Sequence, residues 1–213
     1  ILPQKNYNGI ILNLAELRLY YYMPPSDIYE STRVLTFPVG IGRLDWRTPL
    51  GETFIRYKVK NPDWYPPKSI IMEHEEDGEI LPRVVKSGPN NPLGVYALKL
   101  NVAGGYLLHG TNKKYGIGMK VSHGCIRLRN DDIKTIFYNV SIGTKVKIVD
   151  LPIKIGTYKN FLYMEVHAFN NQEIYSNNQK NSLTTNNIYK PVTPVMEFIE
   201  NNPNYKINTN VLL

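Results

Sequence analysis

The sequence predicts a mainly β protein with a few helices and a small C-terminal appendage. Short apolar runs and alternating apolar and polar residues dominate the first 150 residues, and one segment, 130–139, has clear helical spacing. From residue 170 the composition becomes rich in Asn. A chain of 213 residues, 42% hydrophobic and 20% charged, suffices for one good-sized domain. We therefore predict a domain over 1–150 and an appendage, packed on or beside it, over 151–213.

The first predicted strands are short runs rich in β-branched and aromatic residues, bounded by Gly, Pro or Asn. In the second run, Leu17, Leu19 and Tyr21 alternate with more polar neighbours, which is typical of a half-buried strand. Thr48–Gly51 reads Thr-Pro-Leu-Gly and predicts a turn. The strands expected in this half of the domain are 10–14, 17–22, 33–39 and 53–60.

Residues 61–92 differ from the segments around them. They contain six prolines and an acidic run, Glu73–Asp77, and no clear periodicity. Long ordered loops inside a domain are usually functional or mobile, so this excursion is a candidate lid.

The rest of the chain has one strong helix signal among further strands. Asn130 is a candidate N-cap, two aspartates follow in the first turn, and Ile133, Ile136 and Phe137 have helical spacing. Gly104–Gly105 predicts a hairpin turn. The remaining elements expected are strands at 95–100, 106–109, 144–150, 153–157 and 161–169, an irregular linker at 170–187 and a terminal helix at 191–202.

Composition limits the possible partners. The formal charge of +7 and the pI near 9.3 suit anionic partners, such as nucleic acid, phospholipid or a cell-wall polymer. No recognised nucleic-acid module is present, so we expect no nucleic-acid partner, and no apolar run is long enough for a transmembrane segment. The chain begins at Ile1 rather than Met, so we expect a processed form with any signal peptide or upstream domain out of view.

The most informative stretch runs from His109 to Arg129 and reads HGTNKKYGIGMKVSHGCIRLR. It holds two of the four histidines and the single cysteine, Cys125. A nearby histidine raises the nucleophilicity of a thiol, either by taking its proton or, as imidazolium, by stabilising the thiolate. The loop between His109 and Cys125 can return the chain so that the two meet.

Other residues of this stretch suit acyl transfer. His123 points the same way as Cys125 if the segment is extended. Gly124 lets the main-chain N–H groups of Gly124 and Cys125 face a developing oxyanion. Arg127 can hold a substrate carboxylate by a bidentate pair.

Less specific interpretations of the same residues stay open. A lone cysteine is most often a small buried side chain, and a lone histidine is most often structural. His109, His123 and Cys125 also offer three zinc ligands, but their spacing matches no familiar zinc module, so we expect no metal and no cofactor. Trp46 and Trp64 flank the presumed cleft in sequence, either as its walls or as core. Chemistry alone leaves a cysteine peptidase open.

The segment resembles the signature of the L,D-transpeptidases, the YkuD domain family. In that signature a histidine is followed, after a spacer, by Ser/Thr-His-Gly-Cys and an apolar residue, as in His109 and Ser122–Ile126 here. Flanking stretches resemble the periplasmic branch that attaches the major outer-membrane lipoprotein to peptidoglycan, and the likeness covers most of residues 9–170.

The resemblance implies a β-sandwich catalytic domain and roles for individual residues. Cys125 is the implied nucleophile and His109 the implied base, with its ring held by the carbonyl of Gly110. The residues implied at the oxyanion and substrate site are His123, Gly124, Ser122 and Arg127.

The resemblance also implies the reaction. Cys125 attacks the amide before the terminal D-Ala of a peptidoglycan tetrapeptide stem, and an amine then attacks the thioester. The amine is a lipoprotein Lys or, for a 3→3 cross-link, diaminopimelate. Further implications are inactivation by carbapenems and a periplasmic location. The alternatives are an L,D-carboxypeptidase or amide hydrolase of the same fold, or a catalytically dead wall-binding module.

Overall fold

The computed structural model describes residues 1–25, 31–113, 115–159, 161–167, 200–201, 203 and 206–207. The chain divides into two compact units, described separately below. One consists of Asn6–Val149, and the other of Ile1–Lys5 with Asp150–Leu213. The assignment of catalysis to residues 1–150 stays a prediction.

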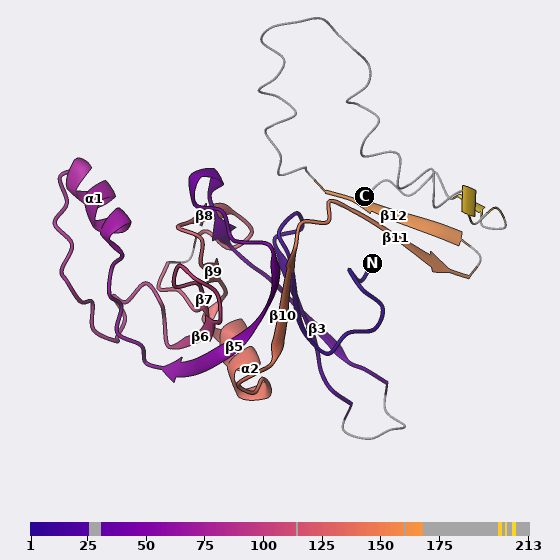
Figure 1. Cartoon of the computed structure of the whole chain (residues 1–213), viewed down its shortest axis with the longest axis horizontal. Coiled ribbons are helices and arrows are strands. Elements are labelled where there is room, and N and C mark those ends of the chain that lie inside the picture. Colours follow the sequence, from indigo (N-terminus) through magenta and orange to yellow (C-terminus); the bar gives the residue numbers. More distant parts are fainter. Residues whose placement is uncertain are drawn as a thin grey trace, which may run out of the picture. The chain divides into compact units, whose positions relative to one another are not determined.

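The larger unit is built mostly of strands (Figure 1). The α-helices among its described residues are α1 (Lys68–Glu76) and α2 (Asn130–Asn139), and a 3-10 turn spans Leu44–Trp46. Its strands are β1 (Gly9–Asn13), β2 (Arg18–Tyr22), β3 (Val34–Pro38), β4 (Ile41–Gly42), β5 (Gly51–Lys60), β6 (Tyr96–Leu100), β7 (Leu107–His109), β8 (Lys120–Ser122), β9 (Ile126–Arg127) and β10 (Lys145–Val149).

Eight of these strands form one sheet in the order β3-β2-β1-β10-β5-β6-β7-β9, and β4 pairs separately with β8. Within the large sheet, β1 pairs with β10 and β7 pairs with β9 in parallel, while the other neighbours are antiparallel. The predicted mainly β fold with a few helices is confirmed. The antiparallel pairing of β6 and β7 also confirms the predicted hairpin.

The main core cluster of this unit extends along the large sheet from β1 and β2 to β7 and β9, and α2 packs against β6 and β7. Leu98, Leu108 and Ile126 have no exposed surface, and neither do Ile133 and Ile136 of α2. The period of two along each strand sends these side chains inward and their neighbours to the opposite face. The residues expected to carry chemistry lie on that opposite face.

The structure differs from the sequence prediction at α1. This helix lies inside the excursion 61–92, where we predicted no regular element, and it begins directly after Pro67. Its apolar residues, Ile70 to Met72, are consecutive and do not repeat at helical spacing, so its sequence lacks the apolar stripe from which helices are predicted, and none of its residues is fully buried. The short strands β4, β8 and β9 were also missed, because two or three residues are too few to establish a period.

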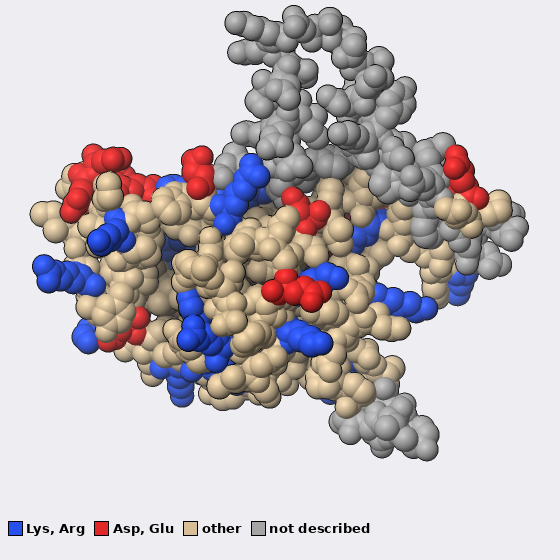
Figure 2. All heavy atoms as spheres, viewed as in Figure 1, with Lys and Arg blue, Asp and Glu red and all other residues tan. Residues whose placement is uncertain are grey.

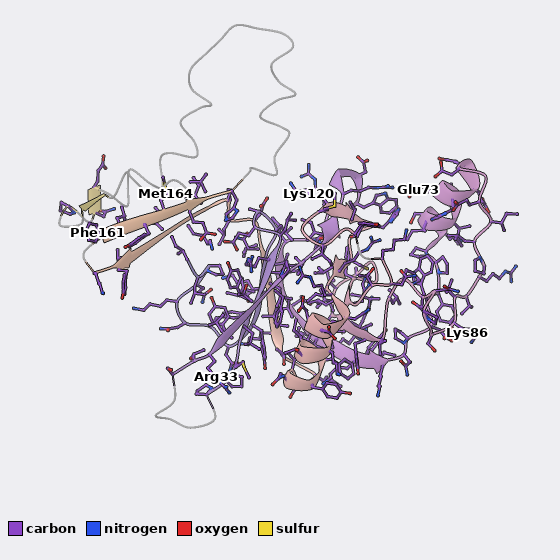
Figure 3. The ribbon with its side chains drawn as sticks, turned by 180° about the vertical axis from the view of Figure 1, so that it is seen from behind. Arg33, Glu73, Lys86, Lys120, Phe161 and Met164 are labelled. Carbon is purple, nitrogen blue, oxygen red and sulfur yellow. The ribbon has the colours of Figure 1, made fainter. Side chains whose placement is uncertain are left out.

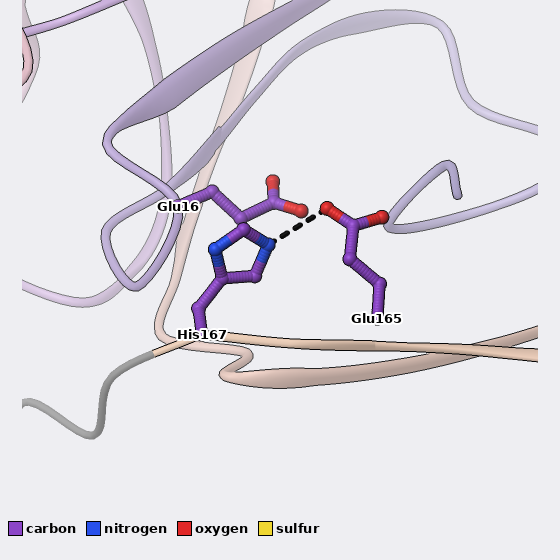
Figure 4. Close-up of side chains that lie close together, drawn as sticks. All are labelled: Glu16, Glu165 and His167. Atoms are coloured by element: carbon purple, nitrogen blue, oxygen red, sulfur yellow. Dashed lines mark hydrogen bonds and ion pairs between the residues drawn. The ribbon is translucent and has the colours of Figure 1, made fainter. Parts of the chain in front are cut away.

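The smaller unit holds a sheet of β11 (Ile153–Tyr158), β12 (Phe161–Val166) and β13 (Lys206–Ile207). The imidazole of His167 contacts the carboxylate of Glu165 at 2.7 Å (Figure 4). The predicted linker 170–187, the end of the predicted strand 161–169 and most of the predicted helix 191–202 lie outside the described residues.

The charged side chains are unevenly distributed. Acidic side chains gather over α1 and the turn after it, whereas Lys and Arg are scattered over the visible face (Figure 2). The positive net charge therefore forms no single basic patch on this face. None of the helices in the described part of the chain has the length and apolar character needed to cross a membrane.

Candidate active site

The register of two neighbouring strands brings three of the predicted site residues onto one face. In the parallel β7–β9 pair, Leu108 lies beside Ile126 and His109 beside Arg127. Residues in register share a face, and every second residue of a strand returns to it. His109 and Arg127 therefore face away from the core, and so does Cys125, two residues before Arg127.

His109 is buried and held in one tautomer. Its Nδ1 lies 2.5 Å from the carbonyl oxygen of Gly110. A carbonyl oxygen can only accept a hydrogen bond, so Nδ1 carries the proton and Nε2 has a free lone pair. Burial, and to a smaller extent the nearby Arg127 guanidinium, lower the pKa of His109 to about 4, although the bond to the Gly110 carbonyl acts in the opposite direction. His109 is thus neutral at pH 7 and able to accept a proton.

Asn130 fixes the backbone that holds this histidine. Its side-chain amide donates to the carbonyl of Thr111 at 2.9 Å and accepts from the Thr111 N–H at 3.2 Å. The predicted N-cap role of Asn130 is wrong, because Asn130 is the first helical residue and makes no capping bond. A Cβ on Gly110 would lie 2.2 Å from the Asn130 Oδ1, which explains the glycine beside His109.

Cys125 is partly exposed, and its thiol is protonated at neutral pH. Burial raises the pKa of Cys125 above its ordinary value. The main-chain N–H of Leu107 and the positive charges of Lys99 and Arg127 act in the opposite direction. A protonated thiol on the same face as a neutral imidazole fits proton transfer from sulfur to histidine better than a preformed ion pair.

Lys99 is a residue of this face that the sequence analysis missed. In the antiparallel β6–β7 pair, Lys99 lies beside Leu107. The main-chain N–H of Leu107 in turn contacts the thiol of Cys125. Its side chain is half-buried, and burial lowers the pKa of Lys99. Only the pairing of β6 with β7 places this lysine near the thiol. The one available signal was a lysine in the middle of an otherwise apolar strand.

A tight turn connects Ser122 to Cys125. Gly124 has φ +99°, and its N–H donates to the Ser122 Oγ at 3.1 Å. The Ser122 hydroxyl donates in turn to the carbonyl of Cys125 at 2.5 Å. This arrangement differs from our expectation, because the Gly124 N–H is engaged and does not face an oxyanion. Of the predicted pair of N–H donors, that of Cys125 is left for such a role.

Thr48, which the sequence analysis placed only in a turn, also supports this segment. Its buried hydroxyl donates to the Gly124 carbonyl at 2.8 Å and lies 3.2 Å from the Gly42 N–H. On the other side of the segment, a Cβ on Gly124 would come within 2.6 Å of the ring of Tyr106. Both contacts restrict the main chain immediately before the thiol.

His123 points to a different partner than we predicted. Its Nε2 is hydrogen-bonded to the carboxylate of Glu73, and its ring centroid lies 5.4 Å from that of Trp46. Among the described residues, His109, His123 and Cys125 do not bring three ligand atoms within 4.8 Å of one another. The alternative of a zinc site therefore finds no support in this geometry.

A cavity of about 570 Å³ lies beside these residues. His123 and Arg127 form part of its wall, and residues of the excursion 61–92 form another part. Trp64, one of the two tryptophans singled out from the sequence, lies in this wall, while Trp46 packs on His123. The rest of the lining includes Ile70, His74, Leu81, Val85, Lys113, Tyr115, Met119 and Val121.

Similar proteins carry the same domain. The L,D-transpeptidase catalytic domain, YkuD, matches residues 7–148. The probable L,D-transpeptidase ErfK/SrfK of Escherichia coli K12 is 40% identical over 98% of this chain and 64% of its own length. The probable L,D-transpeptidase YcfS of the same organism is 45% identical over 87% of this chain and 58% of its own length. The chain thus spans less than two thirds of these relatives.

The fold agrees with these matches. The structure of the Ldtfm-avibactam carbamoyl enzyme superimposes with a TM-score of 0.50 at 18% sequence identity, over 72% of this chain and 51% of the other. At this identity the likeness concerns the fold alone. The domain match over two thirds of the chain and the extent of the identity to the curated relatives show that this chain belongs to the L,D-transpeptidase catalytic domain family.

Proposed function

We propose that this protein is a cysteine-dependent L,D-transpeptidase that acts on the tetrapeptide stems of peptidoglycan. The observation that carries the proposal is the register of β7 and β9, which puts the thiol of Cys125 on the same sheet face as the neutral imidazole of His109. Membership of the family supports the class of reaction. The choice of peptidoglycan as substrate, and of the periplasm as location, follows from the resemblance.

In the first step the Cys125 sulfur attacks the carbonyl carbon of the amide before the terminal D-Ala. The thiol proton moves to the Nε2 of His109, whose Nδ1–H stays on the Gly110 carbonyl. The carbonyl oxygen takes up the negative charge near the Cys125 N–H. When the C–N bond breaks, His109 returns the proton to the leaving nitrogen, D-Ala departs, and a thioester remains on Cys125.

In the second step an amine attacks the thioester. His109 takes a proton from the amine and returns it to the sulfur as the C–S bond breaks. The acceptor amine is the side chain of a lipoprotein Lys or of a diaminopimelate on another stem. If water attacks instead, the product is that of a carboxypeptidase, so a transferase must exclude water from the thioester. The excursion 61–92 forms part of the cavity wall, which suits it to this task.

Arg127 is suited to hold the stem peptide. It lies beside His109 in the strand register, its side chain is half-buried, and it lines the cavity. A charge-assisted bond to a substrate carboxylate contributes about 1.5–3 kcal/mol. We therefore expect Arg127→Ala to raise KM more than it lowers kcat. An unchanged KM would argue against this role.

Intact mass after incubation with a carbapenem tests the nucleophile. The wild-type chain should gain one adduct, and Cys125→Ala should gain none, because Cys125 is the only cysteine. Circular dichroism should show that this variant is folded. A folded wild-type chain that forms no adduct would contradict the proposed nucleophile and would favour a dead wall-binding module.

The acceptor is tested with a tetrapeptide stem, with and without an added amine. Release of D-Ala together with a new, heavier amide product identifies a transpeptidase. Release of D-Ala with only the tripeptide as the other product, at every amine concentration, identifies the L,D-carboxypeptidase alternative. Lipoprotein ending in Lys and diaminopimelate-containing stems should be compared at equal amine concentration.

A further inference from the structure

Helix α1 is attached to its unit mainly by polar contacts. None of its residues is fully buried, and Ile70 and Ile71 are only half-buried. Its residues Glu75 and Glu76 are exposed. A helix with so little buried apolar surface gains little stability from packing, so specific contacts decide its position.

Glu73 makes the most specific of these contacts. One oxygen of its carboxylate lies 2.7 Å from the Arg43 Nη2, and the other is hydrogen-bonded to the Nε2 of His123. Figure 3 labels Glu73 on α1, on the side that faces the rest of the larger unit. Both donors bind the same carboxylate group, and they hold the pKa of Glu73 below its ordinary value.

The two donors do not depend on α1 for their positions. The Arg43 N–H donates to the carbonyl of Ser122 at 2.9 Å, which ties Arg43 to the segment before the thiol. The Arg43 Nη2 lies 3.3 Å from the His123 Nε2, and the ring of Trp46 packs on the other side of His123. The strand and turn segments around the thiol therefore build an anion site, and Glu73 fills it.

The anion site also borders the cavity where a substrate would lie. His123 lines this cavity and is two residues from Cys125. A stem peptide with its scissile amide at the thiol brings several carboxylates into this region. A carboxylate bound to a guanidinium and an imidazole N–H is a strong, geometrically defined contact.

We propose that Arg43 and His123 form a binding site for a carboxylate of the stem peptide, and that Glu73 occupies this site as an internal substitute while α1 is closed. The inference rests on the proposed function and adds a second carboxylate contact besides Arg127. Substrate and lid then compete for the same two donors, so binding of the substrate carboxylate releases α1.

This competition has a measurable consequence. If Glu73 fills the site about 90% of the time, the apparent Kd for a carboxylate ligand is about tenfold weaker than its intrinsic value. Glu73→Gln removes the competing charge and should tighten binding by about that factor. Glu75→Gln is the matched control, because it removes the same charge from an exposed position of the same helix.

Binding is measured by calorimetry in the Cys125→Ala background, which prevents turnover. The probes are the tetrapeptide stem with free carboxylates and the same peptide with every carboxyl group converted to carboxamide. We expect Glu73→Gln to tighten binding of the free peptide about tenfold and to leave binding of the amidated peptide unchanged. Glu75→Gln should change the affinity for neither peptide. Arg43→Gln should weaken binding of the free peptide. In the double variant it should abolish the gain in affinity that Glu73→Gln gives.

Hydrogen exchange supplies a second readout. The free peptide should speed exchange in α1 of the protein that carries Glu73, and the amidated peptide should not. Equal affinities in the Glu73→Gln and Glu75→Gln proteins, or equal responses to both peptides, would overturn the inference. If Glu73→Gln perturbs folding, Glu73→Asp, which shortens the side chain but keeps the charge, should still tighten binding of the free peptide, by less than Glu73→Gln would.

Failure of this inference is distinguishable from failure of the proposed function. Carbapenem acylation depends on Cys125 and is measured separately in the protein with Glu73 and in the Glu73→Gln protein. If both proteins are acylated and do not differ in affinity for the peptide, the carboxylate site is refuted, whereas the proposed transpeptidase function is not. Absence of acylation in both would refute the transpeptidase itself.

Discussion

Replacing His109 with Asn should make the stability of the domain less dependent on pH. The pKa of His109 in the folded chain is about 4, below the ordinary value of 6.5, because the ring is buried. Between these two values the unfolded chain binds a proton that the folded chain does not. Stability therefore falls as the pH falls from about 6.5 to about 4, and this contribution changes no further below that.

The size of the effect follows from the two pKa values. The full difference corresponds to about 3 kcal/mol in the free energy of unfolding, of which about 2 kcal/mol is lost between pH 7.5 and pH 5. Asn is a suitable replacement because its amide can still donate to the Gly110 carbonyl and has no proton to gain in this range.

The assay is urea unfolding of both proteins at pH 7.5 and pH 5. All other titrating groups are shared, so the difference between the two pH dependences isolates His109. We expect the wild-type chain to lose about 2 kcal/mol more than the variant over this interval. Equal losses in the two proteins would show that folding leaves the pKa of His109 unchanged, which would refute the argument that burial lowers this pKa to about 4.

Further predictions concern the supports of the site and the charges around it. Asn130→Ala should cost about 1–3 kcal/mol, since it removes both side-chain bonds to Thr111, which follows β7. Asn139→Ala removes only a bond within its own helix and should change stability by less than about 0.5 kcal/mol; urea unfolding compares the two variants. Gly124→Ala should destabilise more than Gly143→Ala, because both glycines have positive φ but only the first would clash with a neighbour. Thermal unfolding that ranks them equally would contradict this. Lys99→Met should move the pH midpoint of thiol alkylation upward, because the positive charge of Lys99 lowers the pKa of Cys125.

The strands and the second helix were predictable because their local patterns agree with their packing. The helix over 130–139 begins and ends where its spacing predicted, with Ile133 and Ile136 on its buried face. Apart from the β6–β7 hairpin, the strand pairing was not predictable, since the order of strands in a sheet depends on contacts between distant segments. α1 was missed for a related reason: it has no apolar face, and a single charged residue, Glu73, gives it its most specific contact.

The residues of the candidate site likewise divide into those that local sequence predicts and those that depend on contacts between distant segments. His109, Cys125 and Gly110 lie in one short segment with a recognisable spacing, so the sequence alone points to them. Lys99 and Arg43 are invisible to such an analysis, because each reaches the site through a strand pairing or a loop contact. The engagement of the Gly124 N–H was also not predictable, since it depends on the conformation of the turn rather than on its composition.

The core and the site depend on one and the same register. Leu108 and Ile126 are fully buried on one face of β7 and β9, while His109 and Arg127 lie on the other. A slip of one residue would exchange the faces and move apolar side chains into solvent. Burial of the core therefore fixes the thiol and the imidazole on rigid strands, as precise acyl transfer requires. By contrast, α1 has no buried residue and is held through Glu73, so the proposed exchange of this carboxylate for that of a substrate would leave the core intact.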